Sequence, residues 1–419
     1  MNIPFKKANI LLPKNADMTK WSVVACDQYT SEPEYWKEVE SIVGNNPSTL
    51  NLTLPEVYLE SDNVNERISK INENMDKLLN EDFFTELPSS MIYVERTQSD
   101  GKIREGLIGA VDLEDYSYEV GSETLIRATE KTVIERIPPR VKVRENASLE
   151  LPHIMILIDD DKKEIIENLK NKVTSNDIVY DFDLMQNGGH IKGYKLNDNT
   201  MDEVLNKLES LADEDNFKKK YNITDKKVLL FAMGDGNHSL ATAKACYENL
   251  KKKIGLEKAL KSKARYALVE LVNLHSTALE FEAIHRVLFN IDKEKLLNSL
   301  YNYYKINEEG NGQEFTLVVN NTLKTLYIEN PKSNIAVGSI QMFLDDYLKE
   351  NKGKIDYIHG EETTKELSNK ENNIGFIFKP MKKEELFKTV IIDGALPRKT
   401  FSMGHAYDKR YYLEARKIK

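Results

Sequence analysis

Asp235 and His238 lie at a glycine-flanked turn, and their types and spacing suit chemistry on a bound anion. Gly234 and Gly236 let the backbone on either side of Asp235 approach a ligand closely. A carboxylate can hold a metal ion, whereas an imidazole can act as a base or donate a charged hydrogen bond. Asp235 and His238 are therefore candidate catalytic residues, and Asp235 is also the candidate metal ligand.

The sequence around this turn predicts a strand before it and a helix after it. Residues 228–233 form a short apolar run that is typical of a buried strand. Leu240, Ala243, Tyr247 and Leu250 then recur at helical spacing. The first turn of a helix presents unpaired N–H groups and the positive end of the macrodipole, so this junction is suited to binding phosphate.

Asn237 and Ser239 fall in that first turn and join the two glycines as candidate ligand-binding residues. An alternative interpretation keeps the same helix without a site. In it, Asp235 or Asn237 caps the helix and His238 lies on its surface, which is the common role of such residues. A short Gly-Asp-Gly motif does not decide between the two interpretations.

Size and composition limit the classes of protein to consider. A chain of 419 residues predicts two domains or one elaborated α/β domain, and 40% hydrophobic with 30% charged residues indicates an ordinary globular protein. The net charge of -9 argues against a nucleic-acid partner. Cys26 and Cys246 form no metal-ligand pair, and no apolar run approaches membrane-spanning length, so we expect a cytoplasmic protein with reduced thiols and no membrane partner. The oligomeric state is not predicted.

The pattern of elements along the chain favours a mixed or parallel sheet covered by helices. Residues 21–26 are predicted to form a strand, and Pro33 near the start of the next segment predicts a helix whose first turn contains Glu32 and Glu34. A second helix is predicted over 63–79, followed by a hairpin. Beyond residue 151, apolar strands alternate with amphipathic helices.

Four arginines share one short region of this acidic chain. Guanidinium groups match phosphate and carboxylate oxygens in two-pronged fashion, so a cluster facing a ligand is one interpretation. Surface ion pairs with neighbouring glutamates explain the cluster equally well. The arginines are Arg127, Arg136, Arg140 and Arg144, of which Arg127 and Arg140 are our candidate ligand-binding residues.

Two further segments carry charge in unusual places. Arg286 follows His285 inside an otherwise apolar predicted strand, where each needs a partner; a structural ion pair and the edge of a charged site are both possible. Lys399 and Thr400 place an ammonium beside a hydroxyl, which is suited to phosphate oxygens but is also common in exposed loops.

Several of these motifs together resemble a bacterial family known as domain of unknown function 1015, and the likeness spans nearly the whole chain. That family usually has Asp-Gly-His-His-Arg at the central turn, a string also found in free-serine kinases whose fold is similar to ParB-like nucleotide-binding domains. The matching segments are 23–25, 46–47, 106–109, 234–238, the strand from Phe281 with His285 and Arg286, and 396–400.

The resemblance implies transfer of a phosphoryl group from ATP or ADP, with Mg²⁺, to the hydroxyl of a small metabolite such as L-serine. Asp235 and His238 match the aspartate and the second histidine of the motif. Asn237 replaces the first histidine, and Ser239 replaces the arginine, so a two-pronged phosphate ligand is missing.

The resemblance also implies a carboxylate base on the helix after the first strand and a lysine with a hydroxyl residue near the end of the chain. Glu34 is our candidate base, although Glu32 has a similar setting. Lys399 and Thr400 match the second feature. The expected fold is α/β, with a ParB/serine-kinase-like core over 1–290, a smaller α/β subdomain over 291–380, and a tail over 381–419 that returns to the core site.

Two other functions remain open. The replacements at Asn237 and Ser239 are also those expected of a non-catalytic sensor that binds a nucleotide or metabolite. A metal-dependent phosphohydrolase would need more carboxylate and imidazole ligands than the turn provides. The chain lacks the glycine-rich fingerprints of P-loop and dinucleotide-binding proteins.

Overall fold

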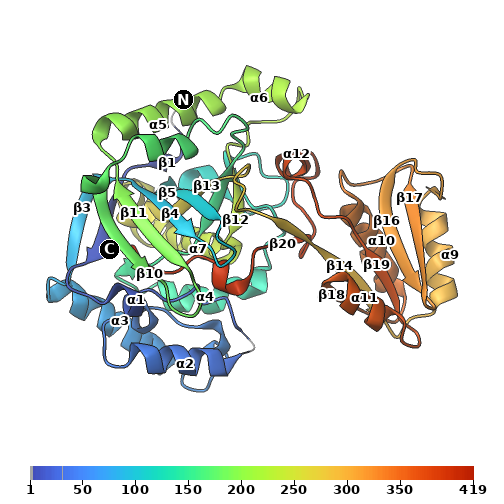
Figure 1. Cartoon of the computed structure of the whole chain (residues 1–419), viewed down its shortest axis with the longest axis horizontal. Helices are drawn as coiled ribbons and strands as arrows, with labels where there is room; N and C mark the ends of the chain where they lie inside the picture. The colour runs from blue at the N-terminus through green and yellow to red at the C-terminus, as the bar shows by residue number, and fades with distance from the viewer. Residues whose placement is uncertain (1–2, 31) are drawn as a thin grey trace. The chain divides into compact units, whose positions relative to one another are not determined.

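The computed structural model describes residues 3–30 and 32–419, and the chain divides into two compact units. The first unit consists of Met1–Ala128, Thr132–Leu279 and His405–Lys419. The second consists of Thr129–Lys131 and Glu280–Gly404. Each unit has its own sheet and helices (Figure 1), which confirms the predicted mixed α/β class.

The first unit is built on a mixed sheet with the order β10-β11-β4-β5-β13-β9-β12-β7-β6, and β1 pairs with β5. Most neighbours are antiparallel, whereas β13 and β9, β12 and β7, and β6 and β7 run parallel. The strands are β1 (Phe5–Lys6), β4 (Ile92–Thr97), β5 (Ile103–Asp112), β6 (Tyr116–Ser117), β7 (Ile126–Arg127), β9 (Met155–Ile158), β10 (Ile178–Asp183), β11 (His190–Lys195), β12 (Phe231–Asp235) and β13 (Tyr266–Asn273).

Helices cover this sheet by burying one apolar face each. In α3 the side chains of Ile68, Ile71 and Met75 are buried, which confirms the predicted helix over 63–79. The predicted hairpin is also confirmed, because β4 and β5 pair antiparallel with Ile92 opposite Ile108. The helices of at least eight residues in this unit are α2 (Pro33–Val43), α3 (Val64–Asn80), α4 (Ile137–Arg144), α5 (Asp198–Leu211), α6 (Glu214–Tyr221) and α7 (Asn237–Ile254).

The strand predicted over 21–26 is wrong. A short helix, α1 (Met18–Trp21), ends where that strand was expected to begin, and only Val24 then forms an isolated bridge, to Tyr411. The physical reason is that this segment lies against the end of the chain rather than in a ladder: the N–H of Tyr412 donates to the carbonyl of Val23 at 2.9 Å. An apolar run of six residues signals burial but does not specify strand pairing.

Residues 405–419 return through the first unit and hold its peripheral strands. β21 (Arg416–Lys417) pairs with β8 (Leu149–Glu150), and Ala415 bridges to Leu11 within β2 (Ala8–Pro13). β2 itself pairs with β3 (Phe84–Ser90). The indole N–H of Trp21 donates to the carbonyl of Leu413 at 2.8 Å inside the core. The end of the chain is therefore part of the scaffold of the first unit.

The second unit contains an antiparallel sheet with the order β15-β17-β16-β19-β14-β18, and β20 also pairs with β14. It begins at Glu280 rather than near residue 291, because β14 pairs with β18, β19 and β20 of this unit. Only 405–419 of the predicted tail leaves it again. The elements are β14 (Phe281–Phe289), β15 (Ile306–Asn307), β16 (Gln313–Val319), β17 (Thr322–Ile328), β18 (Lys354–His359), β19 (Ile374–Ile377), β20 (Phe401–Met403), α9 (Lys293–Tyr303), α10 (Ala336–Glu350), α11 (Glu361–Ser368) and α12 (Lys383–Asp393).

Within residues 3–30 and 32–419, none of the helices combines the length and the apolar character needed to cross a bilayer.

Candidate functional site

The predicted strand, turn and helix are confirmed around Asp235. β12 ends at Asp235, and α7 begins at Asn237. Gly236 joins them with φ of 76°, and a Cβ added there would lie 3.0 Å from the Cα of Ile154. Both facts favour glycine at this position. Oδ1 of Asp235 accepts a hydrogen bond from the N–H of Gly236 at 2.8 Å, so the carboxylate is fixed by the turn itself.

The alternative interpretation of this turn, in which a side chain caps the helix, is wrong. Gly236 occupies the N-cap position of α7, and no side chain makes a capping hydrogen bond there. The first intrahelical bond runs from the N–H of Leu240 to the carbonyl of Gly236 at 3.0 Å. The N–H groups of the first turn are therefore without a side-chain cap, which is the condition that favours binding of an anion.

A buried histidine links this helix to two other segments. Nε2 of His153 lies 3.2 Å from Oγ of Ser239 and 3.3 Å from Oδ2 of Asp27, while Nδ1 lies 2.9 Å from the hydroxyl of Tyr412. The Tyr412 hydroxyl in turn donates to Sγ of Cys26 at 2.9 Å. His153 is therefore fixed at both ring nitrogens.

The pKa values of Asp27 and His153 shift apart. Burial alone would raise the pKa of the Asp27 carboxyl, but the charge and hydrogen bond of His153 outweigh burial and hold that pKa well below its usual range. Burial likewise lowers the pKa of His153, and Asp27 more than compensates, so the pKa of His153 is raised. The two shifts favour an ionised Asp27 and a protonated His153, the state that places positive charge beside Ser239.

A second ion pair lies at the end of β12. Nζ of Lys409 is 3.1 Å from Oδ2 of Asp235, and both side chains are mostly buried. The positive charge of Lys409 also lowers the pKa of Asp27. Lys409 therefore supplies counter-charge to both Asp235 and Asp27, as a bound cation would.

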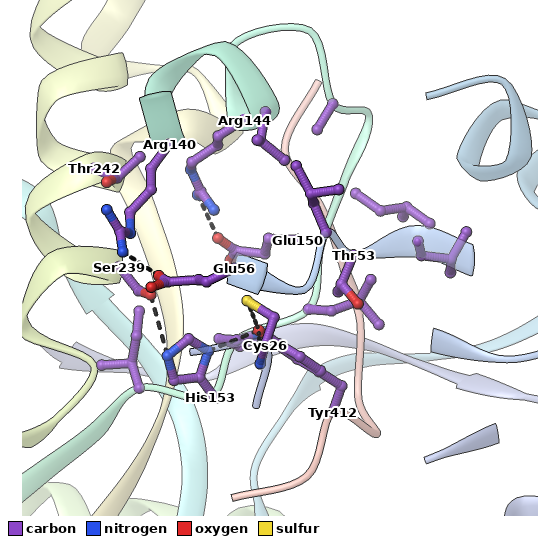
Figure 2. Close-up of a pocket in the computed structure, with 18 of the residues that line it drawn as sticks. Cys26, Thr53, Glu56, Arg140, Arg144, Glu150, His153, Ser239, Thr242 and Tyr412 are labelled. Carbon is purple, nitrogen blue, oxygen red and sulfur yellow. Dashed lines mark hydrogen bonds and ion pairs between the residues drawn. The ribbon is translucent and has the colours of Figure 1, made fainter. Parts of the chain in front are cut away.

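The first turn of α7 borders a cavity of about 140 Å³ within the first unit. Figure 2 shows Arg140, Glu56, Ser239 and His153 along one part of its lining. Arg140 forms an ion pair with Glu56, and the guanidinium of Arg144 donates to Glu150 at 2.5 Å. Another part of the lining is apolar and includes Leu52, Leu54, Leu59, Met75, Val143, Leu149 and Leu151.

His238 lies in the same helical turn and is neutral at physiological pH. Burial lowers the pKa of His238 to about 4, with further lowering by the positive charges of Arg140 and Arg136. Nε2 of His238 and Oδ1 of Asn237 are both buried and have no hydrogen-bond partner within the described part of the chain. Two buried polar atoms beside the turn thus lack a partner among the described residues, although neither side chain lines the cavity.

Glu34 and Arg127 have partners of other kinds. Glu34 lies on α2 with its side chain 80% exposed, and it pairs with Lys37 at 2.8 Å. Arg127 is buried at the end of β7, where its guanidinium donates to the carbonyls of Thr124, Lys227 and Val228. The guanidinium of Arg127 therefore holds the backbone before β12.

Arg286, Lys399 and Thr400 belong to the second unit. The fully buried guanidinium of Arg286 donates to Gln341 and to the carbonyls of Ile284, Arg398 and Lys399. It thereby fixes the loop that precedes β20. The predicted alternatives for Arg286 were an ion pair or a charged site, whereas the structure shows mainly backbone carbonyls as its acceptors.

The loop of Lys399 and Thr400 already binds a carboxylate. Burial raises the pKa of Glu130 to about 6, although the backbone N–H groups of Lys399 and Thr400 and the charges of Lys399 and Arg286 favour its ionised form. The backbone N–H groups of Lys399 and Thr400 therefore bind Glu130. The Thr400 hydroxyl, which was expected to meet phosphate together with the Lys399 ammonium, donates to the carbonyl of Pro397 at 2.7 Å.

Glu130→Gln is expected to stabilise the second unit at pH 8 by about 1–2 kcal/mol and to have little effect at pH 4. A raised carboxyl pKa means that the folded state binds the proton more tightly, so the wild type loses stability as pH rises from about 4.5 to 6. Because Trp21 and Trp36 both lie in the first unit, hydrogen exchange of peptides from β14 and β19 is the suitable measurement. Lower protection of the variant at pH 8 would contradict the assignment.

Sequence reasoning missed Asp27, Glu56, Lys409 and Tyr412, and it left open whether His153 reaches the turn. These residues come from separate segments, so spacing could not group them. One signal was available: Asp27 and His153 each adjoin a short apolar run, which marks a buried segment where a polar side chain needs a partner. His190 instead pairs with Asp181 and Asp183, each at 2.7 Å.

The predicted magnesium ion has a partial ligand set here. Within residues 3–30 and 32–419, no three histidine, cysteine or acidic side chains cluster as a metal site. Asp235 and Asp27 nevertheless share the positive charge of Lys409. One or two carboxylates completed by phosphate oxygens and water are a usual donor set for Mg²⁺, so the residues present fit an ion that arrives with a nucleotide.

The fold and the cavity define an α/β protein with a partly charged cavity beside an uncapped helix. The chain belongs to the family described as protein of unknown function DUF1015, whose model matches residues 3–347. This confirms the resemblance inferred from the sequence. Comparison with curated proteins found no match.

Solved structures share the fold only distantly. A free serine kinase variant in complex with AMP is 12% identical, with a TM-score of 0.38 and coverage of 76% of this chain and 93% of that one. A conserved hypothetical protein from Pyrococcus furiosus is 11% identical, with a TM-score of 0.35 and coverage of 72% and 92%. C-terminally truncated SbnI from Staphylococcus aureus is 11% identical, with a TM-score of 0.36 and coverage of 71% and 82%. At these values the likeness carries no argument about activity.

Proposed function

We propose that this protein is a nucleotide-dependent phosphotransferase that moves a phosphoryl group from ATP or ADP to the hydroxyl of a small metabolite such as L-serine. One observation carries the proposal: the uncapped first turn of α7 borders a cavity whose lining includes Arg140, Arg144 and His153. Backbone N–H groups, guanidinium groups and an imidazolium are the donors that stabilise a transferring phosphoryl group.

The residues of the turn have distinct roles in this proposal. The N–H groups after Gly236, with the hydroxyl of Ser239, bind phosphate oxygens. Protonated His153, already in contact with Ser239, adds positive charge. Neutral His238 offers its buried Nε2 to the ligand. Asp235 would hold Mg²⁺ in place of Lys409, and a bound Mg²⁺ would supply positive charge next to the phosphate oxygens.

The ion pair between Arg140 and Glu56 suggests how the binding of a phosphate group makes a carboxylate available as the acceptor base. The two side chains pair at the cavity wall, where they are 16% and 17% exposed. A phosphate that attracts Arg140 removes the counter-charge of Glu56 and leaves a carboxylate facing the cavity. Because Glu34 is exposed and paired with Lys37, we assign the role of acceptor base to Glu56 in place of Glu34.

The test incubates the purified protein with Mg²⁺, ATP or ADP, and a panel of hydroxyl amino acids, and follows phosphorylated products by ³¹P NMR. Glu56→Gln is expected to lower kcat by about 10²-fold, the usual contribution of a positioned base. Glu34→Gln is the matched control and is expected to retain kcat within about twofold. A large loss in Glu34→Gln with none in Glu56→Gln would return the base to Glu34.

The second candidate function is a sensor that binds nucleotide without turnover. It is favoured by Ser239, which stands where the related motif has an arginine and which here is bound to His153. Calorimetric binding of nucleotide with no product across the whole panel would support the sensor and exclude the kinase. Absence of both binding and turnover would exclude both functions.

A further inference from the structure

A second, larger cavity of the first unit has a basic lining. Its volume is about 400 Å³, which is within the range of small-molecule sites. Glu86 is the acidic residue among the described residues that line it. The basic residues of the lining are Lys6, Lys7, Lys261, Lys263, Arg416 and Lys417. Such an excess of positive charge is unexpected in a chain with a net charge of -9.

The lysines come from separate segments of the fold, so the basic character is not a run of sequence. Lys6 lies on β1, Lys417 on β21, and Lys261 and Lys263 lie between α8 (Leu256–Leu260) and the start of β13. Arg416 stands apart from the lysines, because its guanidinium donates to Glu150 and to backbone carbonyls. Arg416 is therefore held by the fold. Lys263 donates to the carbonyl of Lys419 at 3.2 Å, and an ammonium with one such acceptor keeps two further N–H groups for a ligand.

Ion pairs at the rim are weak enough to be exchanged for a ligand. Lys261 pairs with Glu257 at 2.9 Å while the two side chains are 75% and 87% exposed. Lys417 pairs with Glu86 at 2.9 Å with side chains 39% and 38% exposed. Lys7 is more buried and pairs with Asp202 at 2.8 Å, with Asp198 3.7 Å away, so the exchangeable pairs are those of Lys261 and Lys417. Exposed pairs of this kind contribute little to stability, so an anion with several charges can compete for these lysines at once.

We propose that this cavity is a binding site for a small polyanion that carries two or more phosphate groups. Ammonium groups on flexible stems bind phosphate as point charges from several directions. A ligand with several linked phosphates gains affinity from contacts with several lysines at once, whereas a single phosphate contacts only some of them. The site is distinct from the cavity beside α7, so it stands whether or not the phosphotransferase proposal does.

The test uses tripolyphosphate as the probe, with isothermal titration calorimetry of the full chain at low salt. We expect Lys261→Gln/Lys263→Gln to weaken binding at least tenfold, and orthophosphate to bind at least tenfold more weakly than tripolyphosphate. Lys70→Gln/Lys77→Gln removes the same charge from the exposed face of α3 and is expected to change the affinity by less than about twofold. Equal affinity in the wild type and in Lys261→Gln/Lys263→Gln would overturn the proposal.

Hydrogen exchange then locates the probe. Tripolyphosphate should protect peptides covering 257–265 and 414–419. Protection confined to 236–242 would place it at the α7 turn, which would overturn this inference and leave the phosphotransferase proposal intact. Tighter binding of a short oligonucleotide than of tripolyphosphate, lost in Lys261→Gln/Lys263→Gln, would overturn the assignment to a small molecule.

Discussion

Asp235→Asn is expected to lower kcat/KM for phosphoryl transfer by about 10²–10³-fold, which corresponds to about 3–4 kcal/mol of transition-state stabilisation. The substitution keeps an oxygen that can accept the N–H of Gly236, so the turn retains its hydrogen bond. It removes the negative charge that now pairs with Lys409 and that would hold Mg²⁺. The effect should therefore come from lost charge rather than from a changed backbone.

A matched control variant separates the loss of the Asp235 charge from general effects of an Asp→Asn substitution. Asp225→Asn makes the same chemical change on an exposed residue shortly before β12, and we expect it to retain wild-type kcat/KM within about twofold. The apparent KM for Mg²⁺ should rise in Asp235→Asn and stay unchanged in Asp225→Asn. Turnover by Asp235→Asn within twofold of the wild type, at all Mg²⁺ concentrations, would remove Asp235 from the site.

The turn at Asp235 was predictable because its determinants are local. An apolar run, a glycine break and an apolar helical face are adjacent in sequence, and each is decided by the backbone conformation of a few residues. The mixed α/β class followed from the same kind of periodicity. The segment at 21–26 shows the limit: it is as apolar as a strand, but it lies against residues 410–412, which are nearly four hundred positions away.

The rest of the candidate site depends on contacts between distant segments. His153 contacts Ser239 in the first turn of α7, Glu56 lines the same cavity, Asp27 pairs with His153, and Lys409 pairs with Asp235, each from a different part of the chain. No spacing rule groups such residues. The arginines show the opposite difficulty, because Arg127 and Arg286 have the right charge for a ligand but donate to backbone carbonyls once folded. Residue type alone does not distinguish a ligand-binding guanidinium from a structural one.

Glu270→Gln is expected to reduce the stability of the first unit by about 3–5 kcal/mol, a large share of the roughly 5–15 kcal/mol that folded domains have. Glu270 is 1% exposed at the centre of the sheet. Its Oε2 lies 2.5 Å from Arg410, and its Oε1 lies 3.5 Å from Nε of Arg104. Both arginines are 4% exposed. Arg410 keeps a second carboxylate partner in Glu414, so the substitution removes the negative charge chiefly from the buried guanidinium of Arg104.

The stability that Glu270 contributes is expected to change with pH in one direction. Burial alone would raise the pKa of Glu270, but Arg104, Arg410 and Arg96 outweigh it and lower that pKa. A lowered carboxyl pKa contributes stability above the pKa of the unfolded chain and loses it as pH falls through the folded value. The difference between wild type and Glu270→Gln should therefore be full at pH 7 and shrink in acid. Urea unfolding followed by the fluorescence of Trp21 and Trp36 reports the first unit alone.

Two further variants test whether buried charge causes the loss of stability in Glu270→Gln. Glu73→Gln, on the exposed face of α3, should change the free energy of unfolding by less than about 0.5 kcal/mol. Adding Arg104→Met to Glu270→Gln removes the buried positive charge that Glu270 neutralised, so the double variant should lose less stability than the sum of the single variants. If the stability losses of the two single variants are fully additive in the double variant, or if the loss in Glu270→Gln does not depend on pH, buried charge is not the cause.

The same network connects stability to the proposed site. Arg410 follows Lys409, and the carbonyl of Arg410 accepts the N–H of Ala25 at 2.9 Å, two residues before Asp27. Glu270 thus anchors the segment that places Lys409 beside Asp235 and Tyr412 beside His153. We therefore expect Glu270→Gln to weaken nucleotide binding even under conditions where the first unit stays folded. Calorimetry at low temperature without urea measures this; unchanged affinity would show that the position of Lys409 does not depend on the buried network.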